Sequence, residues 1–77
     1  MRSEKELFKL ATDMVFIEER LQNNPDELVK EELLEEASRI SKILFRKNYD
    51  VNMFLYYKEF YKTLTVPEYY EFIKTLE

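Results

Sequence analysis

Apolar residues recur at three- and four-residue intervals along most of the chain, which is the spacing of one face of an α-helix. The first run has the members Leu7, Leu10, Met14, Ile17 and Leu21. Ser3 and Glu6 lie just ahead of this run with the spacing of a capping box, in which side chains and backbone at a helix start satisfy one another. The pattern predicts a first helix over residues 4–22.

The second apolar run follows a proline, and its members are Val29, Leu33, Ala37, Ile40 and Leu44. Asn24 is placed to cap a helix, and Pro25 suits the first helical position. Glu27 completes a second capping box. We expect this helix to span residues 25–47.

Charged residues divide this second segment into an acidic and a basic half. The acids are Asp26, Glu27, Glu31, Glu32, Glu35 and Glu36, and the bases are Arg39, Lys42, Arg46 and Lys47. Both groups complement the helix dipole. We interpret the acids as a solvated face, with a docking face for a basic partner as the alternative. Arg39, Lys42 and Arg46 form a basic stripe at three- and four-residue spacing, for which dipole complementation and a Glu35–Arg39 pair are the main explanation and a phosphate contact is the alternative.

Two shorter helices follow. Asp50 is placed to cap the third, with Tyr49 able to pack on Phe54. Its buried arc has the members Met53, Phe54, Tyr57, Phe60, Tyr61 and Leu64. In the fourth, either Thr65 is the cap and pairs with Glu68, or Val66 is, because a residue before proline avoids helical torsions. The apolar face of that helix has the members Val66, Tyr69, Tyr70, Ile73 and Leu76.

These four segments predict an all-α fold, because the chain has no glycine and only two prolines to favour hairpin turns. We expect a small antiparallel helical bundle with two long and two short helices, in one helical domain over residues 1–77. The two long helices should form a hairpin, with the short ones folding across its open face.

Composition narrows the classes of function. Residues 1–44 carry a net charge of −4 and residues 45–77 are neutral, which disfavours general nucleic-acid binding. The chain has no cysteine, which favours a cytoplasmic location, and no apolar run approaches the length of a membrane span. We therefore expect a soluble cytoplasmic protein that binds no nucleic acid.

Candidate chemistry is sparse. With neither His nor Cys, the chain offers few general acids, bases or nucleophiles, and we expect no enzymatic activity and no cofactor. Glu31 and Glu35 share a helical face but lack the companion ligands of a bundle metal site, so we expect no metal either. Glu18 lies within the apolar arc of the first helix. It either reaches solvent or a base on a neighbouring helix, or is buried at a functional site.

Aromatic residues are concentrated in the second half, where ten of the twelve follow residue 44. Most fit the predicted buried arcs. Several large apolar residues fall outside these arcs: Phe16, Leu28, Phe45, Leu55, Tyr56 and Phe72. A small bundle cannot bury all of them, so we expect a second apolar surface that binds a protein partner or forms a homodimer. The predicted partner-binding residues are Leu55, Tyr56, Phe72, Phe45 and Phe16.

The order of the predicted helices also suggests a family. A proline-started helix at Asn24-Pro25 follows the first helix, Phe54-Leu55-Tyr56-Tyr57-Lys58-Glu59-Phe60-Tyr61 forms a tyrosine-rich third, and a short fourth follows Thr65. In this order the chain resembles the small bacteriocin immunity proteins of Gram-positive bacteria, which are antiparallel four-helix bundles. The resemblance implies self-protection of a producing cell through a protein complex, an alternative to a general interaction or regulatory module.

Overall fold

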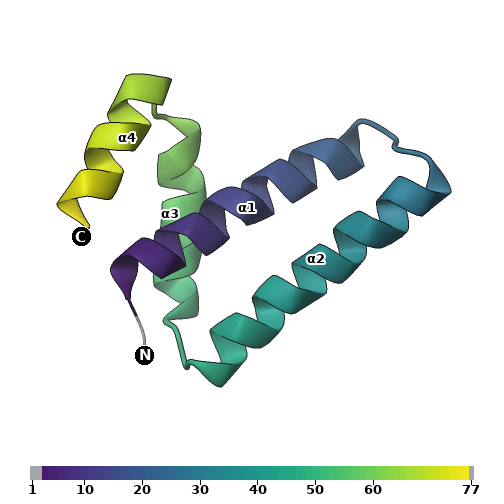
Figure 1. The fold of residues 1–77 in the computed structure, drawn as a ribbon, viewed down its shortest axis with the longest axis horizontal. Helices are drawn as coiled ribbons and strands as arrows, with labels where there is room; N and C mark the ends of the chain where they lie inside the picture. The colour runs from purple at the N-terminus through teal and green to yellow at the C-terminus, as the bar shows by residue number, and fades with distance from the viewer. Residues whose placement is uncertain (1–2, 77) are drawn as a thin grey trace.

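A computed structural model describes residues 3–76 as helices and short connections (Figure 1). Helix α1 spans Glu4–Gln22, α2 spans Glu27–Arg46, α3 spans Val51–Lys62 and α4 spans Val66–Thr75. No strand lies within the described residues. The predicted all-α fold, with two long helices followed by two short ones, is confirmed.

Three helices begin at the predicted caps. The Ser3 hydroxyl accepts the N–H of Glu6, and the Asp50 carboxylate accepts two N–H groups at the start of α3. Thr65 and Glu68 form the reciprocal capping box at the start of α4. Val66 is therefore the first residue of α4 and not its cap. These side chains satisfy backbone donors that the helix itself leaves unpaired.

The start of α2 differs from the prediction. Its cap is Asp26, whose carboxylate accepts the N–H of Val29 at 3.0 Å, so Asn24 and Pro25 belong to the connection. Asn24 has φ 53°, in the left-handed region that asparagine tolerates better than most residues. Asn24 turns the chain between the long helices, and Asp26 brings a negative charge to the amino end of α2.

Helices α1 and α2 form the predicted antiparallel hairpin, and α3 crosses α1 (Figure 1). Helix α4 turns back beside α3, so the short helices lie at one end of the hairpin. The connection at residues 23–26 and the adjoining helix ends extend away from them. The Cα atoms span 38 × 30 × 17 Å, which is a flat shape. As a result, α2 packs chiefly on α1 and keeps an outer face.

The core is centred on Phe8, which α1 places among aromatic side chains of α3 and α4. Phe8 has no exposed surface, and its ring centroid lies 5.4 Å from that of Tyr57 and 4.8 Å from that of Phe72. Tyr61 and Tyr69 approach the same ring, with centroid distances of 6.4 and 5.8 Å. Edge-to-face aromatic contacts, the geometry of most of these pairs, stabilise a fold beyond the area they bury. Phe8 thus joins the acidic half of the chain to the aromatic half.

The arc of α4 that faces the core is shifted from the predicted one, although Tyr69, Ile73 and Leu76 pack against the core as expected. Val66 and Tyr70, predicted to be buried, are 71% and 61% exposed. Phe72, predicted to lie outside the arc, packs on Phe8 and on Phe60, with 4.8 Å between ring centroids in each pair. In a helix of ten residues the spacing allows either arc, and the bulky ring beside Phe8 decides between them.

In the other helices most of the predicted arc faces inward. Helix α2 buries Leu33 and Ile40, and α3 buries Phe54 and Tyr57. Val29 is exposed although it was predicted to belong to the buried arc of α2. Val29 lies in the first turn of α2, at the end of the helix that adjoins the connection from α1.

Candidate interaction surface

The carboxyl-terminal end of α2 and the amino-terminal half of α3 enclose an apolar groove of about 620 Å³, which we call the α2–α3 groove. It is lined by Ser41, Leu44, Phe45, Asn48, Tyr49, Val51, Phe54 and Leu55. Tyr49 and Phe54 are buried and form its floor. Phe45, Val51 and Leu55 are exposed and form its rim. The groove therefore presents a concave apolar surface to solvent.

Among residues 3–76, Phe45 is the most exposed of the large apolar side chains, with 88% of its surface accessible. Single exposed apolar residues are ordinary on protein surfaces, but Phe45 stands beside the exposed Val51 and Leu55 on the same rim. Complete burial of a phenylalanine side chain contributes roughly 1.5–3 kcal/mol. A molecule that covered this rim would gain a substantial part of that free energy from Phe45 alone.

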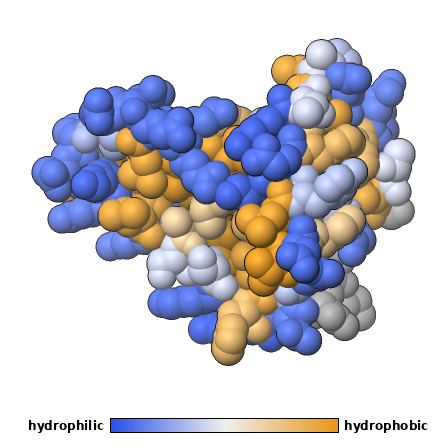
Figure 2. Space-filling model, turned by 180° about the vertical axis from the view of Figure 1, so that it is seen from behind, coloured by the Kyte–Doolittle hydropathy of each residue, from blue (hydrophilic) through white to orange (hydrophobic). Residues whose placement is uncertain are grey.

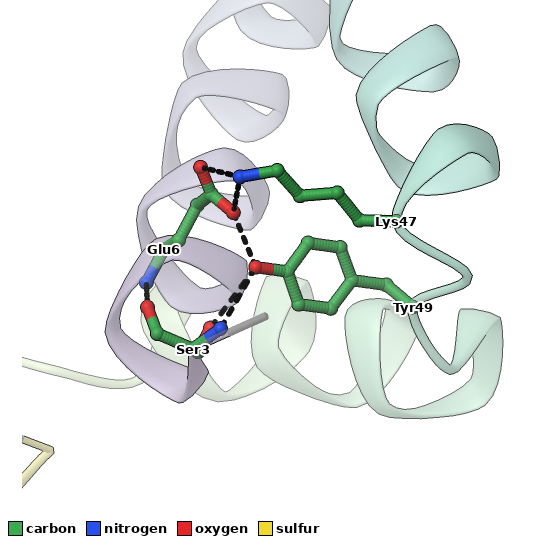
Figure 3. Close-up of polar contacts among 4 residues, drawn as sticks. All are labelled: Ser3, Glu6, Lys47 and Tyr49. Carbon is green, nitrogen blue, oxygen red and sulfur yellow. Dashed lines mark hydrogen bonds and ion pairs between the residues drawn. The ribbon is translucent and has the colours of Figure 1, made fainter. Parts of the chain in front are cut away.

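Tyr49, which lines the groove, belongs to a polar cluster with Ser3, Glu6 and Lys47, which we call the Glu6 cluster (Figure 3). The Tyr49 hydroxyl donates to the Glu6 carboxylate and accepts the N–H of Ser3 at 3.0 Å. Lys47 Nζ donates to the two Glu6 carboxylate oxygens at 2.8 and 2.9 Å. The cluster ties the amino end of α1 to the connection between α2 and α3, so Tyr49 is held in one place.

The contacts of the Glu6 cluster also set its protonation states. Hydrogen bonds from Lys47 and Tyr49 lower the pKa of Glu6. The hydrogen bond to Glu6 raises the pKa of Lys47, and burial, followed by the Glu6 contact, raises the pKa of Tyr49. At neutral pH the cluster therefore holds a carboxylate, an ammonium group and a neutral phenol, the forms in which all these contacts are favourable.

The structure brings together two of the predicted partner-binding residues, Phe45 and Leu55, at the α2–α3 groove. Tyr56 is exposed but outside the groove, and its ring stacks on that of Phe60 with 5.9 Å between centroids. Phe72 was expected to lie exposed outside the core, and this expectation is wrong because its ring is packed in the aromatic core. Of the predicted partner-binding residues, Phe45 and Leu55 are thus the two that line the groove.

Phe16 belongs to a separate apolar patch near the start of α4. Its ring centroid lies 5.9 Å from that of Tyr61, and with Val66 and Tyr70 it borders a hollow of about 240 Å³. Seen from the side opposite to Figure 1, apolar side chains form a broken band between hydrophilic margins (Figure 2). The exposed apolar residues therefore form more than one surface, and the α2–α3 groove is the larger hollow.

Glu18 and Arg39, for which the sequence left alternatives open, each form an ion pair. Lys58 Nζ donates to Glu18 Oε2 at 2.7 Å, so the expectation that Glu18 reaches a base on a neighbouring helix is confirmed. Arg39 pairs with Glu36, one turn before it on α2, and not with the predicted Glu35. Both contacts are ordinary ion pairs between helix side chains.

Periodicity did not identify two exposed apolar residues, Leu34 and Val51. Leu34 follows the buried Leu33 and points about 100° away from it around the helix. The signal that could have found it is a second series at helical spacing, Leu34, Ser38, Ser41 and Phe45. The two serines conceal this series from a search for apolar repeats. Val51 starts α3, where no repeat precedes it.

Other kinds of site are not found in the described part of the chain. Within residues 3–76, no three His, Cys, Asp or Glu side chains are arranged to hold a metal ion. None of the helices in that range has the length and hydropathy of a membrane span. Comparison with protein-family models, curated proteins and solved structures finds no match to this chain. In the described part of the chain, the α2–α3 groove and its rim remain as the candidate interaction surface.

Proposed function

We propose that this chain is a non-catalytic helical interaction module that binds another protein, or a second copy of itself, through the α2–α3 groove. The observation that carries the proposal is the 88% exposure of Phe45 on the rim of a concave apolar surface. Large anchor residues beside apolar hollows supply most of the affinity at many protein interfaces. Leu55 and Val51 extend the same contact along α3.

The groove is also prepared for binding. Phe54 is buried, and the Glu6 cluster holds Tyr49, so the floor exists before a partner arrives. A preformed surface loses little conformational entropy on association. Binding then orders mainly the rim side chains, of which Phe45 has few rotatable bonds.

The polar groups of the groove suit recognition better than catalysis. Among the residues that line it, Tyr49 alone is titratable, and burial raises the pKa of its hydroxyl. That hydroxyl contacts Glu6 and Ser3. General acid–base catalysis needs a titratable group within reach of a substrate at its working pH. Ser41 and Asn48 instead provide the polar margin that is typical of an interface.

The proposal is tested by Phe45→Asp and Leu55→Asp, with Val66→Asp on α4 as the matched control because Val66 is exposed and apolar but lies outside the groove. Light scattering over a concentration series measures self-association, and affinity capture measures other partners. We expect both variants to lose an association that the wild type and the control retain. A wild type that is monomeric at high concentration, with capture unchanged in both variants, would contradict the proposal.

A second candidate function is self-protection of a bacteriocin-producing cell. The observation that favours it is the tyrosine-rich α3 followed by a short α4, which matches the resemblance noted in the sequence, whereas Pro25 lies in the connection and does not start α2. A shared fold does not fix a function, so the test is biological. Expression in bacteriocin-sensitive cells should raise survival against at least one member of a bacteriocin panel, and no gain against any member speaks against this function.

A further inference from the structure

The outer face of α2 carries a series at helical spacing that α1 does not cover: Leu34, Ser38, Ser41 and Phe45. All of these residues are exposed. The series points away from Leu33 and Ile40, which α2 buries in the core. Bulky apolar side chains stand at its two ends and small serines at its centre. Another helix could therefore approach the centre closely while apolar contacts form at both ends.

Charge along one side of this series changes sign at its middle. Glu31 and Glu35 flank the amino half, and Lys42 and Arg46 flank the carboxyl half on the same side of the helix. None of these four forms an ion pair with another described residue. Two such helices side by side in parallel place like charges together. In the antiparallel orientation each acidic half meets a basic half, so the surface is complementary to itself.

We propose that α2 pairs with α2 of a second copy of this chain, antiparallel and about a two-fold axis. An axis that passes midway between positions 39 and 40 places Leu34 against Phe45 of the second copy and Ser38 against its Ser41. On the flank, Glu35 then lies beside Lys42 and Arg46 of the second copy. Because a two-fold axis relates the two copies, each of these residue contacts occurs twice in the dimer. The inference rests on the proposed function and names the second copy as the partner.

A stable dimer needs a larger contact area than α2 alone provides, and the α2–α3 groove can supply the rest. Helix α2 is roughly 30 Å long at 1.5 Å per residue, and a specific interface buries roughly 1,200 Å² or more in total. The amino end of the second copy's α2 continues past Phe45 towards Val51, so the groove rim adds to the helix contact. Exposed ion pairs contribute modestly. The apolar ends therefore provide most of the affinity, and the charges select the orientation.

Charge-reversal variants test whether the partner is a second copy and whether the acidic and basic flanks of the two α2 helices meet. The double variants Glu31→Lys/Glu35→Lys and Lys42→Glu/Arg46→Glu should each raise the dissociation constant of the homodimer at least about tenfold. Mixed together they should form a heterodimer, because one flank is then wholly positive and the other wholly negative. Glu19→Lys/Glu71→Lys is the control for the first variant, since it changes the net charge equally on α1 and α4 and should leave the homodimer intact.

The orientation is tested by single spin labels, which the absence of cysteine makes simple. In the antiparallel pair, labels at Arg39→Cys lie level with the two-fold axis along the helix, so only the width of the helix pair separates them and their distance is short. Labels at Glu27→Cys are separated along the helix by about 37 Å, as the rise of 1.5 Å per residue requires. A parallel pair would give similar short distances at both sites and would overturn the proposal.

A matched pair of substitutions separates this inference from the proposed function. Leu34→Glu should abolish the homodimer, and Val66→Glu should not, because Val66 is exposed and apolar but lies on α4, outside both the series and the groove. Circular dichroism checks that both variants remain helical. A homodimer that survives Leu34→Glu but is lost in Leu55→Asp would overturn the α2 pairing and leave the interaction module standing. A monomeric wild type whose capture of another protein depends on Leu55 would do the same. A monomer with no Leu55-dependent capture would overturn both.

Discussion

The aromatic core around Phe8 and the outer face of α2 use the same residue type in opposite environments. Phe8 has no exposed surface and contacts aromatic rings from α3 and α4, whereas Phe45 is 88% exposed. Leu33 and Ile40 hold α2 to the core from one side. The residues that stabilise this small fold therefore differ from those we propose for binding, and a substitution is expected to alter one property without the other.

The largest effect should come from removing the centre of the core. Phe8→Ala should lower the free energy of unfolding by roughly 3–5 kcal/mol, because it leaves a cavity among four aromatic rings. Phe45→Ala should change the stability of the monomer by less than about 0.5 kcal/mol. Urea denaturation at low protein concentration measures both. Equal losses would show that the two regions are not separate.

Phe72 and Tyr70 sharpen the same comparison within α4. Phe72→Ala should cost roughly 2–4 kcal/mol, because Phe72 contacts both Phe8 and Phe60. Tyr70→Ala should cost less than about 1 kcal/mol, since Tyr70 is mostly exposed. Denaturation of the two variants under the same conditions checks which arc of α4 faces the core. The reverse order of losses would support the arc expected from spacing alone.

The Glu6 cluster should have an intermediate effect. Tyr49→Phe removes the hydroxyl that contacts Glu6 and the N–H of Ser3, and it should cost roughly 1–2 kcal/mol. Tyr56→Phe is the control, because the exposed Tyr56 should tolerate loss of its hydroxyl. Thermal unfolding of both variants provides the measurement. A Tyr49→Phe variant as stable as the control would mean that the cluster does not hold the groove floor.

Local signals predicted the fold well because helix starts are decided by a few neighbouring residues. Ser3, Asp50 and Thr65 cap the helices they were expected to cap. Asn24 and Asp26 are both suitable caps for α2. Which of them caps the helix depends on the turn between the two packed helices, and the local sequence does not specify that turn. The sequence therefore predicted helix existence and order better than this one boundary.

The candidate site was predicted in part. Phe45 and Leu55 were identified because they fall outside the apolar repeats of α2 and α3. These helices have enough turns for the repeat to show which face is buried. Phe72 was misplaced because α4 is too short for its repeat to fix which arc faces inward. Leu34 was missed because its companions on the outer face are serines. A role for Leu34 in binding depends on how a second molecule would pack on the outer face of α2. The apolar pattern of one chain carries no information about that packing.

The smallest effects should be those of pH. The pKa of Glu6 is lowered in the fold, so its contribution to stability is present above its ordinary pKa and is lost as the pH falls through the lowered value. Burial, and then the hydrogen bond to Glu4, raises the pKa of Tyr57 to about 12. Its contribution is present below the ordinary value of 10.0 and is lost as the pH rises from there towards 12.

Unfolding measured across both pH ranges tests these directions. The alkaline loss should be smaller in Tyr57→Phe, and the acid loss should be smaller in Glu6→Gln. A wild type whose stability does not change in either range would contradict the assigned contacts.

The separation of core and binding face is tested most directly by comparing the wild type with Phe45→Glu. Sedimentation velocity over a concentration series measures self-association, and denaturation at low concentration measures stability. We predict that the wild type sediments increasingly as a dimer while Phe45→Glu remains a monomer with nearly unchanged stability. Identical sedimentation of the two proteins, or a loss of stability in Phe45→Glu as large as that of Phe8→Ala, would contradict it.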